Sequence, residues 1–199
     1  MTTFFLVRHA ACEGLGEIIW GRTPGIHLNE EGRAHAEQLA QRFEAIKVDA
    51  IYSSPLERAR ETAEAIACVA QLEVQLNDAF NEIDFGEWSG KSFAALRGDE
   101  RWGRFNTQRS MTTIPHGESF RDVQARALDE LERLSRQHGS AHVAIVSHAD
   151  VIKAVVSYIA GAPIDLWSRL EISPSSVSIV AMDEHETKLL AVNNNSELV

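Results

Sequence analysis

Phe4-Phe5-Leu6-Val7-Arg8-His9-Ala10, near the start of the chain, is the stretch that decides the fold. Its four consecutive apolar residues predict a short buried β-strand that stops at two polar side chains. In an open α/β sheet the ligand crevice lies beyond the carboxyl ends of the strands, so Arg8 and His9 fall where a functional site is expected. Taken alone, such a pair is more often part of a salt-bridged scaffold, and the assignment therefore depends on the rest of the chain.

A second stretch repeats this plan. His142-Val143-Ala144-Ile145-Val146-Ser147-His148 also predicts an apolar strand that ends at a histidine, and a mostly apolar helix is expected directly after it. Further short strands are expected at 49–52 and 74–76, and a hairpin of two strands within 176–192. Because strands alternate with helices along the chain, we expect an α/β fold with a largely parallel sheet.

Two other helices have recognisable first turns. Asn29 precedes two glutamates and a run of helically spaced apolar residues, and Ser119 stands three residues before Asp122 at the start of a clearly periodic run. Residues 91–116 contain short helical stretches without firm boundaries, and we interpret them as an insertion over the sheet.

The helix after the strand at 49–52 places an arginine in an unusual position. Ser54, Pro55 and Glu57 together predict a capping box with proline in the first helical turn. Arg58 then lies at the positive end of the helix dipole, which is unfavourable unless an anion or a carboxylate lies nearby. The alternative is a surface ion pair with Glu57 or Glu61.

Composition limits the classes of partner. The chain has 199 residues, 44% of them hydrophobic, which fits one domain over residues 1–199 with a sizeable core. The formal net charge of −10 disfavours nucleic acid and anionic membrane as partners of the whole surface. Any anion site is therefore expected to be a local basic pocket.

Cysteine usage and the N-terminus predict a cytoplasmic protein. Cys12 and Cys68 are too few for a disulfide framework, and their spacing matches no zinc pattern, so we expect no metal. Residues 1–7 lack the charged and long apolar regions of a signal peptide, and no apolar run reaches the ~18 residues of a membrane span.

The polar residues at the strand ends predict one phosphate site. His9 and His148 follow two strands, and Arg58 opens a helix that follows a third, so all three are expected at one crevice with Arg8. Forked arginine donors suit a phosphate or a carboxylate, and a neutral imidazole can attack phosphorus in line. Glu82, which lies among aromatic residues, is the available acid for the leaving oxygen.

Five motifs together resemble the histidine phosphatase superfamily, also called the phosphoglycerate mutase-like family. In chain order they are Arg8-His9, Ser53-Ser54-Pro55-x-x-Arg58-Ala59-x-x-Thr62, Glu82-x-Asp84-Phe85-Gly86-x-Trp88-x-Gly90, Gly117-Glu118-Ser119 and Val146-Ser147-His148. Each motif alone is weak, but their order over residues 4–160 is specific.

The resemblance implies a role for each of these side chains. His9 is similar to the phosphorylated nucleophile, Arg8, Arg58 and His148 to the phosphate pocket, and Glu82 to the proton donor. It also implies a three-layer α/β/α fold with a mostly parallel central sheet, no metal or other cofactor, and a lid formed by the insertion. The implied activity is hydrolysis of a small phosphorylated metabolite through a phosphohistidine.

The loops that contact the leaving group are expected at residues 11–28 and in the insertion. Trp20, Gly21 and Arg22 are candidates for a substrate wall, and His116 could reach the pocket from the insertion. Cys12 is interpreted as an ordinary small residue, because no feature indicates a lowered thiol pKa. The sequence names neither the substrate nor the oligomeric state.

The chain departs from the family pattern after each histidine. The family usually has glycine where this chain has Ala10 and Ala149-Asp150. We expect the Ala10 methyl group to narrow the space in which the backbone approaches phosphate, and Asp150 to add a carboxylate close to it. Two alternatives follow: a phosphoglycerate mutase, or a phosphate-binding module without turnover. The mutase branch typically has Arg-His-Tyr-Gly after the glutamate and an asparagine after the first histidine. Residues 83–86 are Ile-Asp-Phe-Gly and residues 10–22 lack asparagine, which favours the phosphatase branch.

Overall fold

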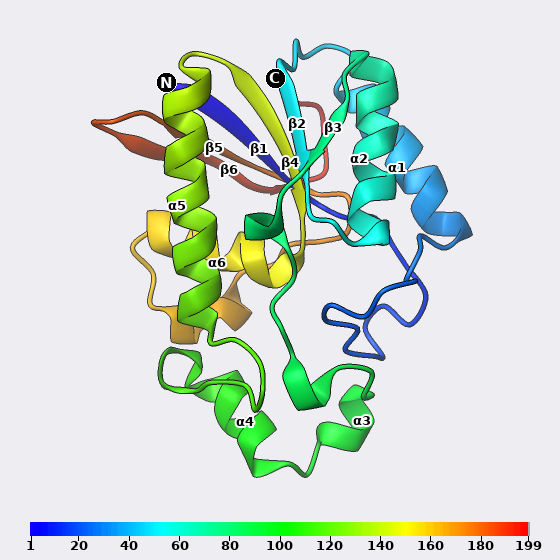
Figure 1. Ribbon diagram of the computed structural model, residues 1–199, viewed down its shortest axis with the longest axis vertical. Helices are drawn as coiled ribbons and strands as arrows, with labels where there is room; N and C mark the ends of the chain where they lie inside the picture. Colours follow the sequence, from blue (N-terminus) through cyan, green and yellow to red (C-terminus); the bar gives the residue numbers. More distant parts are fainter. Residues whose placement is uncertain (199) are drawn as a thin grey trace.

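The computed structural model describes residues 1–198, and within them the chain forms a six-stranded sheet in the order β3-β2-β4-β1-β5-β6 (Figure 1). The strands are β1 (Thr2–Arg8), β2 (Ala50–Ser53), β3 (Val74–Leu76), β4 (His142–Ser147), β5 (Val177–Met182) and β6 (Thr187–Asn194). Strands β1 to β4 are parallel to one another, and β5 is antiparallel to both of its neighbours. The predicted mostly parallel sheet is confirmed.

Helices cover both faces of this sheet, as Figure 1 shows. On one face lie α1 (Glu30–Arg42) and α2 (Glu57–Ala70), and on the other α5 (Phe120–His138) and α6 (Ala149–Ile159). Side chains alternate along β1: Phe4 and Leu6 belong to the core beneath α5 and α6, whereas Phe5 and Val7 belong to the core beneath α1 and α2. The apolar run at the start of the chain is therefore buried on both faces, which gives three layers.

The register of the central strands brings the two histidines together. β1 pairs in parallel with β4, with Arg8 opposite Ser147. The residues that follow the two strands, His9 and His148, therefore leave the same edge of the sheet side by side. The His9 backbone N–H donates to the Ser147 carbonyl at 2.9 Å, which extends the ladder by one bond. Both histidines consequently stand at the carboxyl ends of neighbouring strands.

Residues 91–116 lie beyond this edge of the sheet, at the lower end of Figure 1. They form α3 (Phe93–Leu96), α4 (Glu100–Thr107) and a 3₁₀ turn at Arg109–Met111. An aromatic cluster anchors them to the body: the ring of Trp102 lies 5.2 Å from that of the fully buried Trp88, and Phe105 is also fully buried. The segment is thus a packed unit above the strand ends.

The predicted capping box at the start of α2 is wrong. The helix begins at Glu57, and its N-cap residue Leu56 makes no side-chain capping bond. The Ser54 hydroxyl is instead 2.8 Å from Nε2 of His148, because Ser54 directly follows β2 at the strand ends and the helix starts three residues later. The capping box predicted for α5, by contrast, is present.

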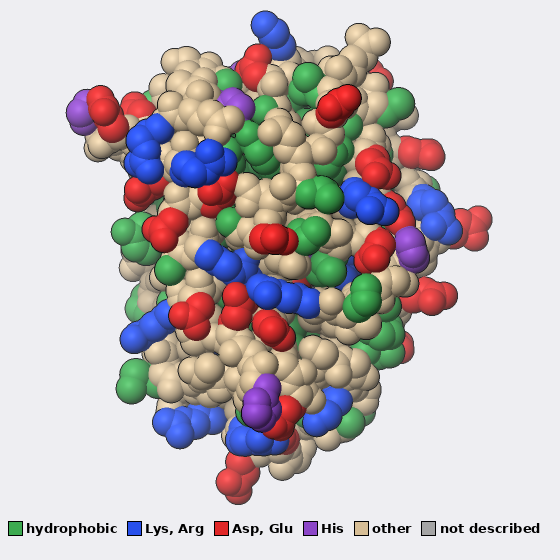
Figure 2. Space-filling view, viewed as in Figure 1, with side chains coloured by type: hydrophobic (Ala, Val, Ile, Leu, Met, Phe, Trp, Pro, Cys, Tyr) green, Lys and Arg blue, Asp and Glu red, His purple; other side chains and the backbone are tan. Residues whose placement is uncertain are grey.

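The surface is mixed in charge. Figure 2 shows acidic and basic side chains interspersed over the face in view, with a group of lysine and arginine side chains near its centre. Over residues 1–198, none of the helices combines the length and the apolar character that crossing a membrane requires.

Candidate active site

His9 is buried, with 4% of its surface exposed. Its Nδ1 lies 2.7 Å from the Ala10 carbonyl oxygen, which can only accept, so this contact assigns the ring proton to Nδ1 and leaves Nε2 with a free lone pair. Burial, and then the charges of Arg58 and Arg8, hold the pKa of His9 well below its usual value. The ring is therefore neutral at physiological pH, which is the form that can attack phosphorus.

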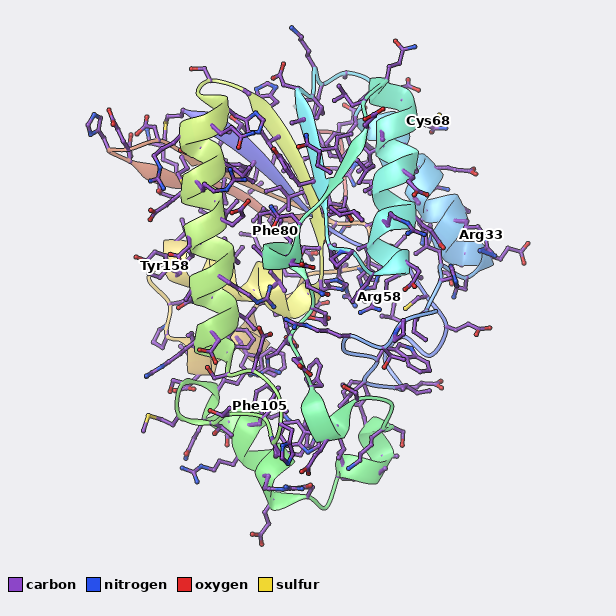
Figure 3. All side chains as sticks on the ribbon, viewed as in Figure 1. Arg33, Arg58, Cys68, Phe80, Phe105 and Tyr158 are labelled. Atoms are coloured by element: carbon purple, nitrogen blue, oxygen red, sulfur yellow. The ribbon has the colours of Figure 1, made fainter. Side chains whose placement is uncertain are left out.

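Arg58 is the second residue of α2 and is 2% exposed, which excludes the surface-pair alternative (Figure 3 labels it at the start of this helix). Its Nη2 donates to the Gly21 carbonyl at 2.8 Å and lies 3.4 Å from Nδ1 of His148. Its Nη1 is buried and has no hydrogen-bond partner among residues 1–198. An anion bound at the N-terminus of α2 would accept a hydrogen bond from this unsatisfied donor.

Arg8 supplies a second guanidinium to the same place. Its Nη1 donates to the Ile172 carbonyl at 2.6 Å, which fixes the side chain against the strand ends. Its Nε, like Nη1 of Arg58, is buried without a hydrogen-bond partner in the described part of the chain. Two fixed cations with free donors create a local basic pocket within an acidic protein.

His148 caps α6 and is fully buried. Its ring centroid is 5.1 Å from that of His9, and its Nδ1 lies 3.6 Å from Oε2 of Glu82. Burial and the charge of Arg58 hold the pKa of His148 well below its usual value. Ser54 fixes the other ring nitrogen, Nε2, so the ring presents Nδ1 to Arg58 and Glu82.

Glu82 is a carboxylate that lies beside His148 and lines the same cavity as His9. Burial, followed by repulsion from Asp150, raises its pKa to about 7, although the charge of Arg58 acts in the opposite direction. The backbone is held in place because Arg22 Nε donates to the Glu82 carbonyl at 2.8 Å and Arg126 Nη2 at 3.2 Å. Glu82 can thus carry a proton near neutral pH and also release it.

Arg8, His9, Arg58 and Glu82 line a cavity of about 280 Å³, whereas the fully buried His148 lies behind its wall. Trp20 and Gly21 also line the cavity, together with residues of the insertion and of α6. Arg22 and His116, which the sequence also suggested for substrate contact, do not. The Arg22 side chain is occupied by the Glu82 carbonyl and by Glu118, and His116 is 83% exposed and faces Glu87.

Sequence reasoning missed three parts of the cavity wall: Arg109, Lys153 and Trp167. Arg109 is 2% exposed, and its guanidinium lies 3.4 Å from the centroid of the Trp167 ring and 3.0 Å from Oδ1 of Asp150. No sequence signal separates this arginine from the four other cations of the insertion. In residues 1–198, no group of three or more His, Cys, Asp or Glu side chains is arranged to hold a metal ion.

The Ala10 methyl group does not narrow the cavity. Ala10 is fully buried in a small cluster with Leu28 and Ala36, and it is absent from the cavity wall. Replacing Ala10 with glycine is therefore expected to lower the free energy of unfolding by about 1 kcal/mol, from lost methyl burial and added backbone freedom. Urea unfolding measures this loss. Binding of inorganic phosphate should be unchanged, and a clear gain in its affinity would contradict this placement of the methyl group.

The sequence model of the histidine phosphatase superfamily (branch 1) matches residues 4–195. Phosphoserine phosphatase 1 of Hydrogenobacter thermophilus is 31% identical over 97% of this chain and 92% of its own. The structure of Bacillus stearothermophilus YhfR is similar with a TM-score of 0.92, at 28% identity and 99% coverage of both chains.

Phosphoserine phosphatase of Entamoeba histolytica is similar with a TM-score of 0.87, at 28% identity and 100% coverage of both chains. Its structures contain phosphoserine in one case and 3-phosphoglyceric acid in the other. The match over residues 4–195, together with the shared architecture, gives the assignment: the chain belongs to branch 1 of the histidine phosphatase superfamily.

Proposed function

We propose that the protein hydrolyses a small phosphomonoester through two phosphoryl transfers, first to Nε2 of His9 and then to water. The observation that carries the proposal is the tautomer of His9 beside unsatisfied arginine donors. Its free Nε2 shares a buried pocket with Nη1 of Arg58 and Nε of Arg8, neither of which has a partner among residues 1–198. A phosphoryl group would satisfy both donors while presenting phosphorus to the nucleophile.

In the first transfer, Nε2 of His9 attacks phosphorus and the bond from phosphorus to the ester oxygen breaks. Arg8 and Arg58 stabilise the charge on the equatorial oxygens, and protonated Glu82 gives its proton to the leaving oxygen. In the second transfer, the Glu82 carboxylate takes a proton from water as that water attacks phosphorus, and the bond to Nε2 breaks. Phosphate leaves, and His9 and Glu82 regain their starting states.

The size of the cavity favours a small metabolite as substrate. About 280 Å³ lies just below the ~300 Å³ at which the usual range for small-molecule sites begins, so the cavity can enclose a small metabolite but no folded phosphoprotein. Two of the similar proteins support a small substrate, because both are named phosphoserine phosphatases and one of them was solved with phosphoserine and with 3-phosphoglyceric acid. Residues 91–116 would then act as a lid that shields the phosphohistidine from bulk water.

Phosphate release tests this proposal. The protein, treated with excess chelator, is incubated with a panel of small phosphomonoesters that includes para-nitrophenyl phosphate, phosphoserine and phosphoglycerate. We expect multiple turnovers and an acid-labile phosphoenzyme in quenched samples. Isomerisation of phosphoglycerate without net phosphate release would instead identify a mutase, and phosphate binding without turnover of any ester would identify a binding module.

Asp150 is expected to set the pH range of the reaction. Burial and, after it, the charge of Asp150 raise the pKa of Glu82 to about 7. Glu82 acts protonated in the first transfer, so kcat/KM falls as the pH rises through about 7. In Asp150→Asn this repulsion is lost and Arg109 loses its counter-charge, and both changes lower the pKa of Glu82. The alkaline limb of the profile for an alkyl phosphate should therefore move to lower pH.

Asp183→Asn is the matched control for Asp150→Asn. Asp183 lies in the turn between β5 and β6, outside the cavity wall, so its replacement removes the same charge away from the site. It should leave the pH profile where it is. An unmoved alkaline limb in Asp150→Asn, or one displaced to higher pH, would show that Glu82 is not the acid that limits the reaction.

A further inference from the structure

The cavity wall includes a lysine that the proposed chemistry does not use. Lys153 lies on α6, borders the cavity and is 9% exposed. Its Nζ stands 4.8 Å from the centroid of the Trp167 ring. No hydrogen bond or ion pair within residues 1–198 involves its ammonium group. A largely buried lysine whose ammonium has no direct ion pair loses hydration, and the charges of Asp150 and Glu171 offset this loss only in part.

The nearest acidic side chain on the same helix does not neutralise Lys153. Asp150, one turn earlier, directs Oδ1 to Nη1 of Arg109 at 3.0 Å. The aromatic rings of Trp167 and Phe105 fix that guanidinium at 3.4 and 4.3 Å from their centroids. Arg109 and Asp150 therefore compensate each other. Burial lowers the pKa of Lys153, as expected for a cation whose charge is only partly balanced.

Much of the remaining cavity wall is apolar. Aromatic and aliphatic side chains from the loop after β1, from the segment after Glu82 and from the insertion line it: Leu15, Ile18, Trp20, Phe85, Phe93 and Trp102. The cavity thus offers Arg8 and Arg58 for a phosphoryl group, an apolar wall, and Lys153 as a cation without a direct ion pair. A matching ligand has a phosphate and a second anionic group joined by an apolar frame.

That the cation is a lysine and not an arginine indicates which anionic group of the substrate it binds. A second phosphate would favour the forked donors of an arginine, but the fork of Arg109 is already occupied by Asp150. A single ammonium matches the single charge of a carboxylate. We infer that Lys153 is a specificity-determining residue that binds a carboxylate on the leaving group of the substrate. The inference rests on the proposed function and narrows it to phosphomonoesters of apolar carboxylic acids.

Binding of non-hydrolysable phosphonates tests this inference without turnover. Calorimetry compares phenylphosphonate with the meta and para isomers of phosphonobenzoate and with their neutral carboxamides, on the wild type and on Lys153→Met and Lys153→Arg. The wild type should bind one carboxylate isomer about 10- to 100-fold more tightly than phenylphosphonate, as a charged hydrogen bond provides. Lys153→Met should lose this preference, Lys153→Arg should keep most of it, and the carboxamides should gain nothing.

Lys47→Met is the matched control, because Lys47 is exposed and lies outside the cavity wall. It changes the net charge by the same amount and should preserve the preference for the carboxylate. The inference is overturned if neither isomer binds the wild type more tightly than phenylphosphonate, or if Lys153→Met weakens all ligands equally. A retained preference in a protein that releases no phosphate from any ester would instead refute only the proposed hydrolysis.

Discussion

Replacing His9 with alanine is expected to lower kcat/KM on every phosphomonoester on the order of 10⁴-fold or more, as for other enzymes that lose their nucleophile. Alanine has no lone pair to form the bond to phosphorus, and the other nearby imidazole, His148, is committed to Ser54 through Nε2. The acid-labile phosphoenzyme should disappear together with turnover. Steady-state phosphate release and quenched-sample phosphoenzyme counts measure the two effects.

Phosphate binding should survive in His9→Ala, because Arg8 and Arg58 keep their free donors. This separates loss of the nucleophile from loss of the fold. His185→Ala, on the exposed hairpin turn between β5 and β6, is the matched control and should behave as the wild type. Comparable activity in His9→Ala, or a phosphoenzyme that persists in it, would place the nucleophile elsewhere.

The sequence could predict where the site lies because strand ends are encoded locally. Apolar runs that stop at His9 and His148 mark buried strands, and a parallel sheet brings the ends of such strands to one edge. The three-layer fold follows from the same feature, since Phe4 to Val7 are apolar at consecutive positions and face a separate core on each side. These inferences require only the periodicity of the chain.

Other parts of the site depend on contacts between distant segments. Ser54 matched a helix cap by its spacing from Glu57, but its hydroxyl contacts His148, which is 94 residues away in the chain. Arg109 looked like one of several surface cations and is buried against Trp167 and Asp150. Local patterns rank residues by their neighbours in sequence, so they cannot show which polar group a tertiary contact will bury.

Asp150 illustrates how a departure from the family pattern can be reinterpreted. In the sequence it appears as an extra carboxylate near a phosphate. In the structure Asp150 forms an ion pair with Arg109, which balances part of its negative charge. The charge of Asp150 still contributes to the raised pKa of Glu82. The insertion, which carries Arg109, is thereby coupled to the protonation of the proposed acid.

Glu82→Gln is expected to show an effect that depends on the leaving group. Alkoxide leaving groups need a proton, so kcat/KM for an alkyl phosphate should fall about 10²- to 10⁴-fold, the usual contribution of a general acid. The nitrophenolate ion leaves without one, so kcat/KM for para-nitrophenyl phosphate should change far less. Glutamine also has no titrating group, and the decline in the wild-type profile as the pH rises through about 7 should be absent.

The second transfer gives Glu82→Gln a further signature. With para-nitrophenyl phosphate the phosphohistidine still forms, but water must attack it without a base, so a burst of nitrophenolate should precede slow turnover. Glu87→Gln, a more exposed glutamate in the same segment that faces Arg101 and His116, is the matched control. Equal losses on both esters without a burst would assign Glu82 to positioning, because only a proton donor discriminates between leaving groups by their basicity.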